Sequence, residues 1–207
     1  LTCQRATMVN LDCEGQPLRP AFVWLDQREQ NKLDKMSWYW RLFFTLAGEK
    51  QTIDYFRSQA EANWIKHQQP DIWKKTHKFM LLSGFHSFKL TGNYVDSISS
   101  QVGYLPFDFK QHTWSKPLDW RWQALPIKKE MLSELIPCGD ELGKISQHAS
   151  NDTGIPVGLP LISAGSDKAC EVLGSGCLTP ETGSLSYGTT ATYNTTNTKY
   201  VEAIKRL

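Results

Sequence analysis

Leu161-Ile-Ser-Ala-Gly-Ser-Asp167-Lys-Ala-Cys-Glu-Val-Leu-Gly174 predicts a strand, a tight turn and a helix in direct succession. The strand is expected over 161–164, the turn at 165–167 and the helix from Lys168 to about Leu173. Ligands of open α/β sheets gather beyond the carboxyl ends of the strands. At that edge, the Asp167 carboxylate could accept a proton from a substrate hydroxyl. The competing interpretation, which the segment alone favours, is that Asp167 only caps the helix.

Downstream, two β-rich runs at 183–187 and 191–195 flank the tripeptide Gly188-Thr189-Thr190. A glycine followed by two hydroxyl residues can form a turn whose amides and hydroxyls hold phosphate oxygens. Because such turns also occur in ordinary hairpins, this signal is weak by itself.

Upstream, Gln4-Arg5-Ala6-Thr7 and Trp24-Leu25-Asp26-Gln27-Arg28 each bring charge to the end of an expected strand. Arg and Asp side chains hydrogen-bond hydroxyl groups, and an indole face can stack on the C–H surface of a sugar. Arg5, Trp24 and Asp26 are therefore candidates for binding a polyhydroxylated ligand. An exposed ion pair and a core tryptophan are an equally good interpretation of these residues.

The rest of the chain mixes expected strands and helices, which indicates the α/β class. Strands are expected at 7–12 and 21–25, as a hairpin or an adjacent pair. We expect one long helix over 71–90, because apolar residues recur there at three- and four-residue steps. Further helices are expected over 27–35, from 38 to near Gly48 with Ser37 as the cap, over 128–135, and over 147–153.

Composition excludes several classes of protein. The 207 residues are 40% hydrophobic and 21% charged with a net charge of +2 and no run of basic residues, so neither nucleic acid nor an acidic membrane is an expected partner. No segment approaches the roughly 18 apolar residues of a membrane span, and no signal peptide is recognisable. The five cysteines form no CxxC pair and the histidines are scattered. We therefore expect no bound metal through these residues, and a reducing, cytoplasmic location.

Taken in order, several segments resemble the FGGY family of carbohydrate kinases. The run from Gly15 to Arg28 resembles the family's "G-x-P … A-x-x-W-x-D-x-R" strand. Further matches follow along the chain: Asn63-Trp-Ile-Lys66, Pro70-Asp-Ile72, Leu81, Lys89-Leu-Thr-Gly92, Gly139 to Gly143, Thr153-Gly-Ile-Pro156, Gly165-Ser-Asp167, Gly174-x-Gly176 and Tyr187-Gly-Thr-Thr190. Each match is modest, but their order and spacing extend over nearly the whole chain.

The resemblance implies a partial ribonuclease H-like fold of the actin/hexokinase type. Residues 1–176 would be the later part of the family's N-terminal, sugar-binding domain, and 177–207 the first strands of its nucleotide domain. The implied full-length protein transfers the γ-phosphate of ATP, with Mg²⁺, to a sugar or polyol, and could be a homodimer. Asp167 would be the catalytic base. Arg5, Trp24, Asp26 and Lys168 would orient the substrate, and Gly188, Thr189 and Thr190 would hold phosphates.

The sequence also departs from the family pattern. Glu61 stands where a lysine usually precedes the tryptophan of the helical region. Arg5-Ala6 replaces the Arg-Glu pair of glycerol kinases and the Met-His pair common in xylulose kinases, and Lys168 replaces a glutamine of glycerol kinases. Neither of these two specificities is therefore indicated.

Three further expectations follow. The family's "D-x-G-T" phosphate loop would precede residue 1 and its adenosine-binding segment would follow residue 207, so the chain alone is expected to be inactive. A catalytically inactive, sugar-binding relative is one alternative, because the Arg5-Ala6 pair is altered. The other is a carbohydrate-binding module, suggested by eight tryptophans; such modules are usually β sandwiches, with which a long helix does not agree.

Overall fold

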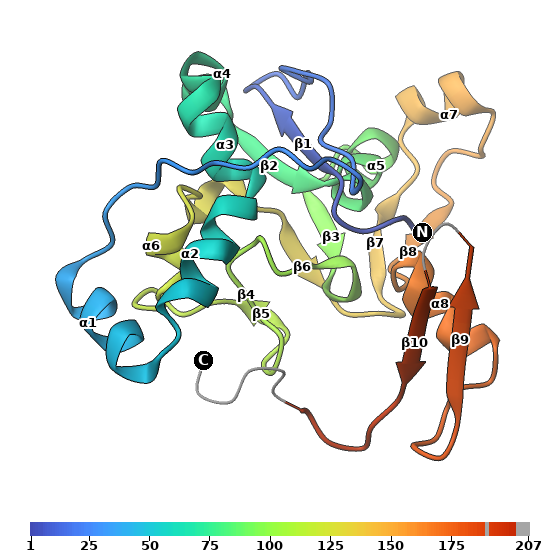
Figure 1. The fold of residues 1–207 in the computed structure, drawn as a ribbon. Helices are drawn as coiled ribbons and strands as arrows, with labels where there is room; N and C mark the ends of the chain where they lie inside the picture. Colours follow the sequence, from blue (N-terminus) through green and yellow to red (C-terminus); the bar gives the residue numbers. More distant parts are fainter. Residues whose placement is uncertain (189–190, 202–207) are drawn as a thin grey trace.

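The computed structural model describes residues 1–188 and 191–201, and these alternate short strands with helices (Figure 1). The strands are β1 (Met8–Leu11), β2 (Lys78–Leu81), β3 (Val95–Ser97), β4 (Phe107–Asp108), β5 (Thr113–Trp114), β6 (Glu134–Ile136), β7 (Glu141–Lys144), β8 (Pro160–Ile162), β9 (Gly183–Tyr187) and β10 (Ala191–Thr195). The helices are α1 (Trp38–Ala47), α2 (Lys50–Gln59), α3 (Glu61–Gln68), α4 (Pro70–Lys75), α5 (Leu82–Thr91), α6 (Arg121–Ala124), α7 (Gln147–Thr153) and α8 (Asp167–Gly174), with 3₁₀ turns at Ile98–Ser100 and Lys129–Met131.

Two of the five described strand pairs join parts of the chain that are distant in the sequence, and the other three join neighbouring strands. β1 is antiparallel to β2, with Asn10 opposite Phe79, and β3 is parallel to β6. β7 and β8 are antiparallel, as are β4 with β5 and β9 with β10. Strands and helices thus alternate in a mixed arrangement, which confirms the predicted α/β class.

The prediction of one long helix over 71–90 is wrong. The segment contains α4, then β2, then α5, and β2 pairs with β1 along its whole length. Phe79 and Leu81 are each 1% exposed, because they enter the core on one side of this strand pair. A helical spacing of apolar residues was therefore overridden by tertiary strand pairing, which a local pattern does not contain.

Three other expected elements also differ from the structure. The expected strand at 21–25 is reduced to one bridge between Phe22 and Met8, and the chain turns where the Asp26 amide donates to the Val23 carbonyl (2.9 Å). Residues 27–35 form no helix and run in extended form, with the Gln30 amide donating to the Ser58 carbonyl (2.8 Å). Residues 128–135 contain the 3₁₀ turn at 129–131 and the start of β6 instead of a helix.

The predictions of α1, α7, α8 and the strands β9 and β10 are confirmed. α1 ends at Gly48, whose φ of 77° is a left-handed conformation that glycine adopts without strain. Ser37 precedes α1, but its hydroxyl donates to Gln123 and forms no cap hydrogen bond. α7, α8 and the β9–β10 hairpin lie where the sequence predicts them.

The core is built largely from aromatic side chains. Trp120 packs edge-on against Phe44 and Phe56, with ring centroids 5.6 and 5.5 Å away, and Phe22 packs edge-on against Trp64 at 5.3 Å. Most of the tryptophans are therefore core or core-edge residues. In the described part of the chain the sheets are all two-stranded, so the β-sandwich binding module is not the fold of this protein. No described helix has the length and apolar character needed to cross a membrane.

We expect the Phe79→Ala variant to lose about 3–5 kcal/mol of unfolding free energy, because the deleted ring leaves a cavity between β2 and Trp73, whose ring centroid lies 5.5 Å away. Urea denaturation measures the loss. Leu118→Ala is the control, since Leu118 is 87% exposed and its truncation should change stability by no more than ~0.5 kcal/mol. Equal midpoints for the two variants would contradict the placement of Phe79.

Glu61, the first residue of α3, gives a prediction about pH. Burial, reinforced by the nearby charge of Asp26, raises the pKa of the Glu61 carboxyl from 4.5 to about 7. A pKa raised on folding means that the folded state holds the proton more tightly. This contribution to stability is therefore complete below about pH 4.5 and is lost as the pH rises through 7.

The Glu61→Gln variant should accordingly lose less stability than the wild type between these two pH values. Urea midpoints at several pH values measure the difference. Burial also raises the pKa of Asp96, to about 6, so part of the slope remains in the variant. Glu134→Gln, at an exposed position in β6, is the matched control and should keep the wild-type slope. Parallel curves for the wild type and Glu61→Gln would contradict the burial of this carboxyl.

Candidate active site

A cavity of about 650 Å³ lies where the N-terminal segment, the start of α8 and the β9–β10 hairpin meet. In Figure 1 these three parts lie together on one side of the molecule. Five of the predicted site residues border this cavity, although they come from four separate parts of the chain. The lining consists of Gln4, Arg5, Ala6, Trp24, Val102, Asp167, Lys168, Ser186, Tyr187, Gly188 and Thr192.

Asp167 is the first residue of α8, and Ser166 is its cap. The Ser166 hydroxyl accepts from the Ala169 amide (3.3 Å), so the interpretation of Asp167 as the residue that caps the helix is wrong. The Asp167 amide donates to the Cys3 carbonyl (3.0 Å), which ties the helix start to the N-terminal segment. The Asp167 carboxylate is exposed and accepts only from the Lys168 amide (2.7 Å) among the described residues. It is thus available to a ligand.

Lys168 lines the same cavity, but its ammonium group already has partners. Its Nζ donates to Glu171 Oε2 (2.7 Å) and to Ser186 Oγ (2.8 Å). This hydrogen bond from Lys168 holds the pKa of the Glu171 carboxyl below its usual range. Lys168 thus joins α8 to β9 across the wall of the cavity.

Arg5 and Trp24 bring a charge and an aromatic side chain to the same cavity. Arg5 is exposed and forms no ion pair among the described residues, and Trp24 is 47% exposed. Between Arg5 and the strand β1, Ala6 has a φ of 55°, a left-handed conformation that is unusual for a residue with a Cβ. Strained backbone of this kind occurs preferentially at functional sites.

Asp26 does not line the cavity. Its carboxylate accepts two hydrogen bonds from Arg28 Nε, at 2.9 and 3.1 Å, and this hydrogen bonding lowers the pKa of Asp26. The Arg28 guanidinium in turn lies over the rings of Phe22 and Trp64, 4.1 and 4.6 Å from their centroids. Asp26 therefore holds Arg28 against the core rather than facing a ligand in this structure.

The hairpin supplies backbone near Asp167. Gly188 borders the cavity, and apart from its own chain neighbours no atom of the described residues lies within 4 Å of where its Cβ would be. Thr189 and Thr190, the other two predicted phosphate contacts, lie outside the described residues. Val102 and Ser186 are lining residues that sequence reasoning missed. For Ser186 the only signal in the sequence was the alternation of side chains along the strand β9. Val102 lies in an irregular segment that shows no pattern of apolar residues.

The arrangement offers one free carboxylate, one free guanidinium, an indole face and open backbone around one space. These groups can hydrogen-bond a polyhydroxylated molecule and accept a proton from one of its hydroxyls. Among the described residues, no cluster of three or more His, Cys, Asp or Glu side chains could hold a metal ion.

Comparison with known proteins identifies the family. A family model described as the N-terminal domain of the FGGY family of carbohydrate kinases matches residues 1–174. The chain belongs to this family. This FGGY chain is 29% identical to the xylulose kinase of Staphylococcus xylosus over 182 residues, which are 88% of the chain and 37% of the relative. It is also 29% identical to the L-fuculokinase of Escherichia coli K12, covering 80% of the chain and 34% of that protein.

Solved structures of a xylulose kinase and a glycerol kinase share the fold. The ligand-bound xylulose kinase of Lactobacillus acidophilus has a TM-score of 0.73 at 19% identity, covering 94% of this chain and 39% of that one. Plasmodium falciparum glycerol kinase with ADP has a TM-score of 0.67 at 19% identity and covers 92% and 39% respectively. The predicted actin/hexokinase-type fold is thereby confirmed. The FGGY chain spans less than two-fifths of the length of these proteins.

The cap assignment leads to a prediction about stability. We expect Ser166→Ala to cost about 1 kcal/mol of unfolding free energy, because the Ala169 amide loses its acceptor. Ser146→Ala is a matched comparison, since Ser146 caps α7 through the Ala149 amide (3.1 Å), and it should cost a similar amount. Asp167→Asn removes only a charge at an exposed helix start, worth ~0.3–1 kcal/mol. A larger loss for Asp167→Asn than for Ser166→Ala in urea titrations would return the cap role to Asp167.

Proposed function

We propose that the full-length protein is an ATP-dependent kinase that phosphorylates a hydroxyl group of a sugar or polyol. The observation that carries this proposal is the position of Asp167. Its exposed carboxylate borders the same cavity as Arg5 and Trp24, although these residues are far apart in the sequence. A carboxylate near a bound hydroxyl, without an ion-pair partner of its own, is what a general base needs.

In this proposal each group has a distinct task. Asp167 accepts the proton of the substrate hydroxyl as the hydroxyl oxygen attacks the phosphoryl group. Arg5 hydrogen-bonds other hydroxyls, and the Trp24 ring packs on the C–H face of the sugar. Lys168, held by its hydrogen bonds to Glu171 and Ser186, forms part of the cavity wall and orients the substrate there. Asp26 contributes to substrate binding only if its pair with Arg28 opens.

Open space beside Gly188 supports a phosphate site at the hairpin. Gly188 has no side chain between its backbone and the cavity, and open space lies around it. When bound, ATP with Mg²⁺ supplies the phosphoryl group and neutralises its charge. We assign Gly188, together with Thr189 and Thr190, to phosphate binding. We also infer that residues 177–207 begin the second, nucleotide-binding domain.

The substrate is a small molecule, and its identity is a matter for experiment. The names of the relatives point to ketoses and polyols, whereas the Arg5-Ala6 pair matches neither the glycerol kinase nor the xylulose kinase pattern. Five cysteines without a disulfide support a cytosolic location. A homodimer stays a prediction.

The Asp167→Asn variant of the full-length protein is expected to lose turnover by a factor on the order of a hundred or more, because the substrate hydroxyl loses its proton acceptor. ADP release with ATP, Mg²⁺ and a panel of ketoses, aldoses and polyols measures it. Asp152→Asn is the matched control, since Asp152 is an exposed carboxylate on α7 that does not line the cavity. Its turnover should equal that of the wild type.

Two results would contradict the proposal. If Asp167→Asn retains wild-type turnover, Asp167 is not the base. If no compound is turned over while some raise the melting temperature of the wild type, the protein is an inactive, sugar-binding relative. The altered Arg5-Ala6 pair is the feature that favours this second candidate.

A further inference from the structure

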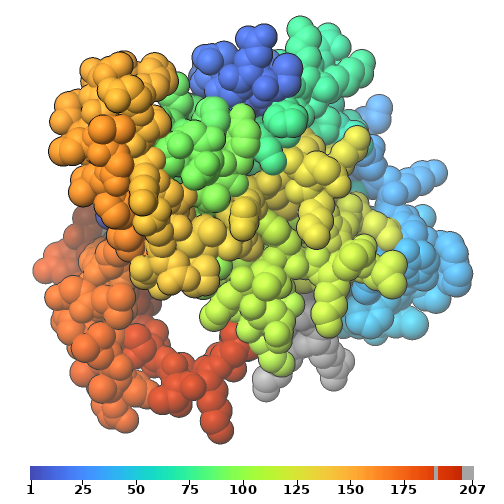
Figure 2. Space-filling model, turned by 180° about the vertical axis from the view of Figure 1, so that it is seen from behind, coloured from blue at the N-terminus to red at the C-terminus, as the bar shows by residue number. Residues whose placement is uncertain are grey.

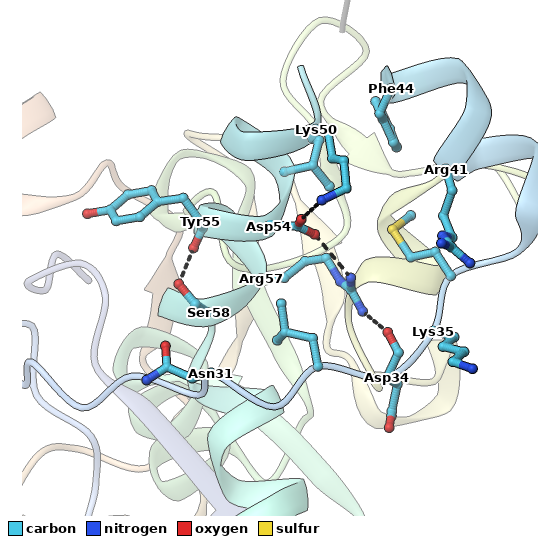
Figure 3. Close-up of a pocket in the computed structure, with 13 residues that line it drawn as sticks. Asn31, Asp34, Lys35, Arg41, Phe44, Lys50, Asp54, Tyr55, Arg57 and Ser58 are labelled. Carbon is cyan, nitrogen blue, oxygen red and sulfur yellow. Dashed lines mark hydrogen bonds and ion pairs between the residues drawn. The ribbon is translucent and has the colours of Figure 1, made fainter. Parts of the chain in front are cut away.

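A second pocket, of about 520 Å³, lies between residues 31–36, α1 and α2 (Figure 3). It shares no lining residue with the cavity that contains Asp167. Small-molecule sites in proteins typically have volumes of ~300–1,000 Å³. The pocket is therefore large enough for a small organic ligand, and the proposed kinase reaction does not use it.

Arg57, on α2, is the buried charge at the centre of this pocket. Its side chain is only 6% exposed. One terminal nitrogen donates to the Asp34 carbonyl, another lies 3.6 Å from Asp54 Oδ1, and Nε is buried without an acceptor among the described residues. A buried donor without a partner is costly, and one of the ways in which proteins satisfy it is a bound ligand.

Three further cations, Lys35, Arg41 and Lys50, line the same pocket as Arg57. Arg41 and Lys35 are exposed, and within the described part of the chain neither side chain forms an ion pair. Lys50 pairs with Asp54 (3.0 Å). In Figure 3 the side chains of Arg41, Lys50 and Arg57 approach the pocket from α1 and α2, on either side of it.

The carboxylates of the pocket do not balance these charges. Four cations and two carboxylates, Asp34 and Asp54, line the pocket. The Asp34 carboxylate is already occupied, because its oxygens lie 2.6 Å from Lys66 Nζ and 3.4 Å from His67 Nε2. Asp54 is already shared by Lys50 and Arg57. The pocket therefore keeps an excess of positive charge, which favours an anion.

We propose that this pocket binds the phosphate group of a small phosphorylated metabolite as an effector separate from the substrate. Guanidinium groups bind phosphate oxygens by strong, charge-assisted hydrogen bonds. Phe44 and Ile53, which also line the pocket, would contact the carbon skeleton of the ligand. Because no residue is shared with the cavity around Asp167, this inference stands independently of the kinase activity.

Nuclear magnetic resonance of the arginine Nε–H groups tests the proposal directly on the chain described here. Glucose 6-phosphate is the probe, with inorganic phosphate, unphosphorylated glucose and sodium chloride of equal ionic strength as comparisons. We expect a saturable shift of the Arg57 Nε–H signal with glucose 6-phosphate and a weaker one with inorganic phosphate. Glucose and chloride should leave the signal unchanged.

The double variant Lys35→Gln/Arg41→Gln should weaken this binding by about tenfold or more, because two charge-assisted contacts are lost. Both residues are exposed, so the fold should be retained. Lys89→Gln/Lys110→Gln is the matched control, since it removes the same charge at exposed positions outside the pocket. Its affinity should stay within about twofold of the wild type, because only long-range, screened attraction changes.

Three outcomes would overturn the proposal. One is a shift that chloride reproduces, which would mean general ionic screening. Another is an equal loss of affinity in both double variants. The last is the absence of any saturable change at Arg57 up to high millimolar phosphate, since a site of this charge should bind in that range.

Discussion

One hydrogen bond between distant parts of the chain organises the candidate site. The Asp167 amide donates to the Cys3 carbonyl, so the start of α8 lies against the N-terminal segment. Directly after this contact, Arg5 and the strained Ala6 lead into β1, and the bridge from Met8 to Phe22 brings the chain back to Trp24. β1 is itself held by its full-length pairing with β2. The carboxylate, guanidinium and indole therefore share a cavity because the strand pair and this bond fix their backbones.

Local structure could be predicted where the residues that determine it lie within one short segment. The strand, turn and helix around Asp167 needed only an apolar run and a Gly-Ser turn, and the β9–β10 hairpin needed two β-rich runs around a glycine. The segment 71–90 failed because its helical spacing competes with β1, a partner about seventy residues upstream. Residues 21–25 failed because a single residue, Phe22, is buried there while Val23, Trp24 and Leu25 are 47–59% exposed.

The family resemblance named candidate site residues that no local pattern links, and most of them come together in the structure. Arg5, Trp24, Asp167, Lys168 and Gly188 border one cavity. Asp26 does not border the cavity, because Arg28 lies only two residues away in the sequence and already binds the Asp26 carboxylate. Lys168 likewise has Glu171 one helical turn later. A ligand and a neighbouring side chain compete for the same charged group in such cases. The outcome depends on the geometry of the folded chain, which the composition does not reveal.

The most direct test of this account is a crystal structure of the full-length protein with the sugar or polyol that raises its melting temperature most. We expect a substrate hydroxyl within hydrogen-bonding distance of the Asp167 carboxylate, about 2.6–3.2 Å. Arg5 should contact a second hydroxyl, and the Trp24 ring should lie along the C–H face of the ligand. A sugar bound elsewhere, with Asp167 facing only solvent, would contradict the assignment of this cavity as the active site.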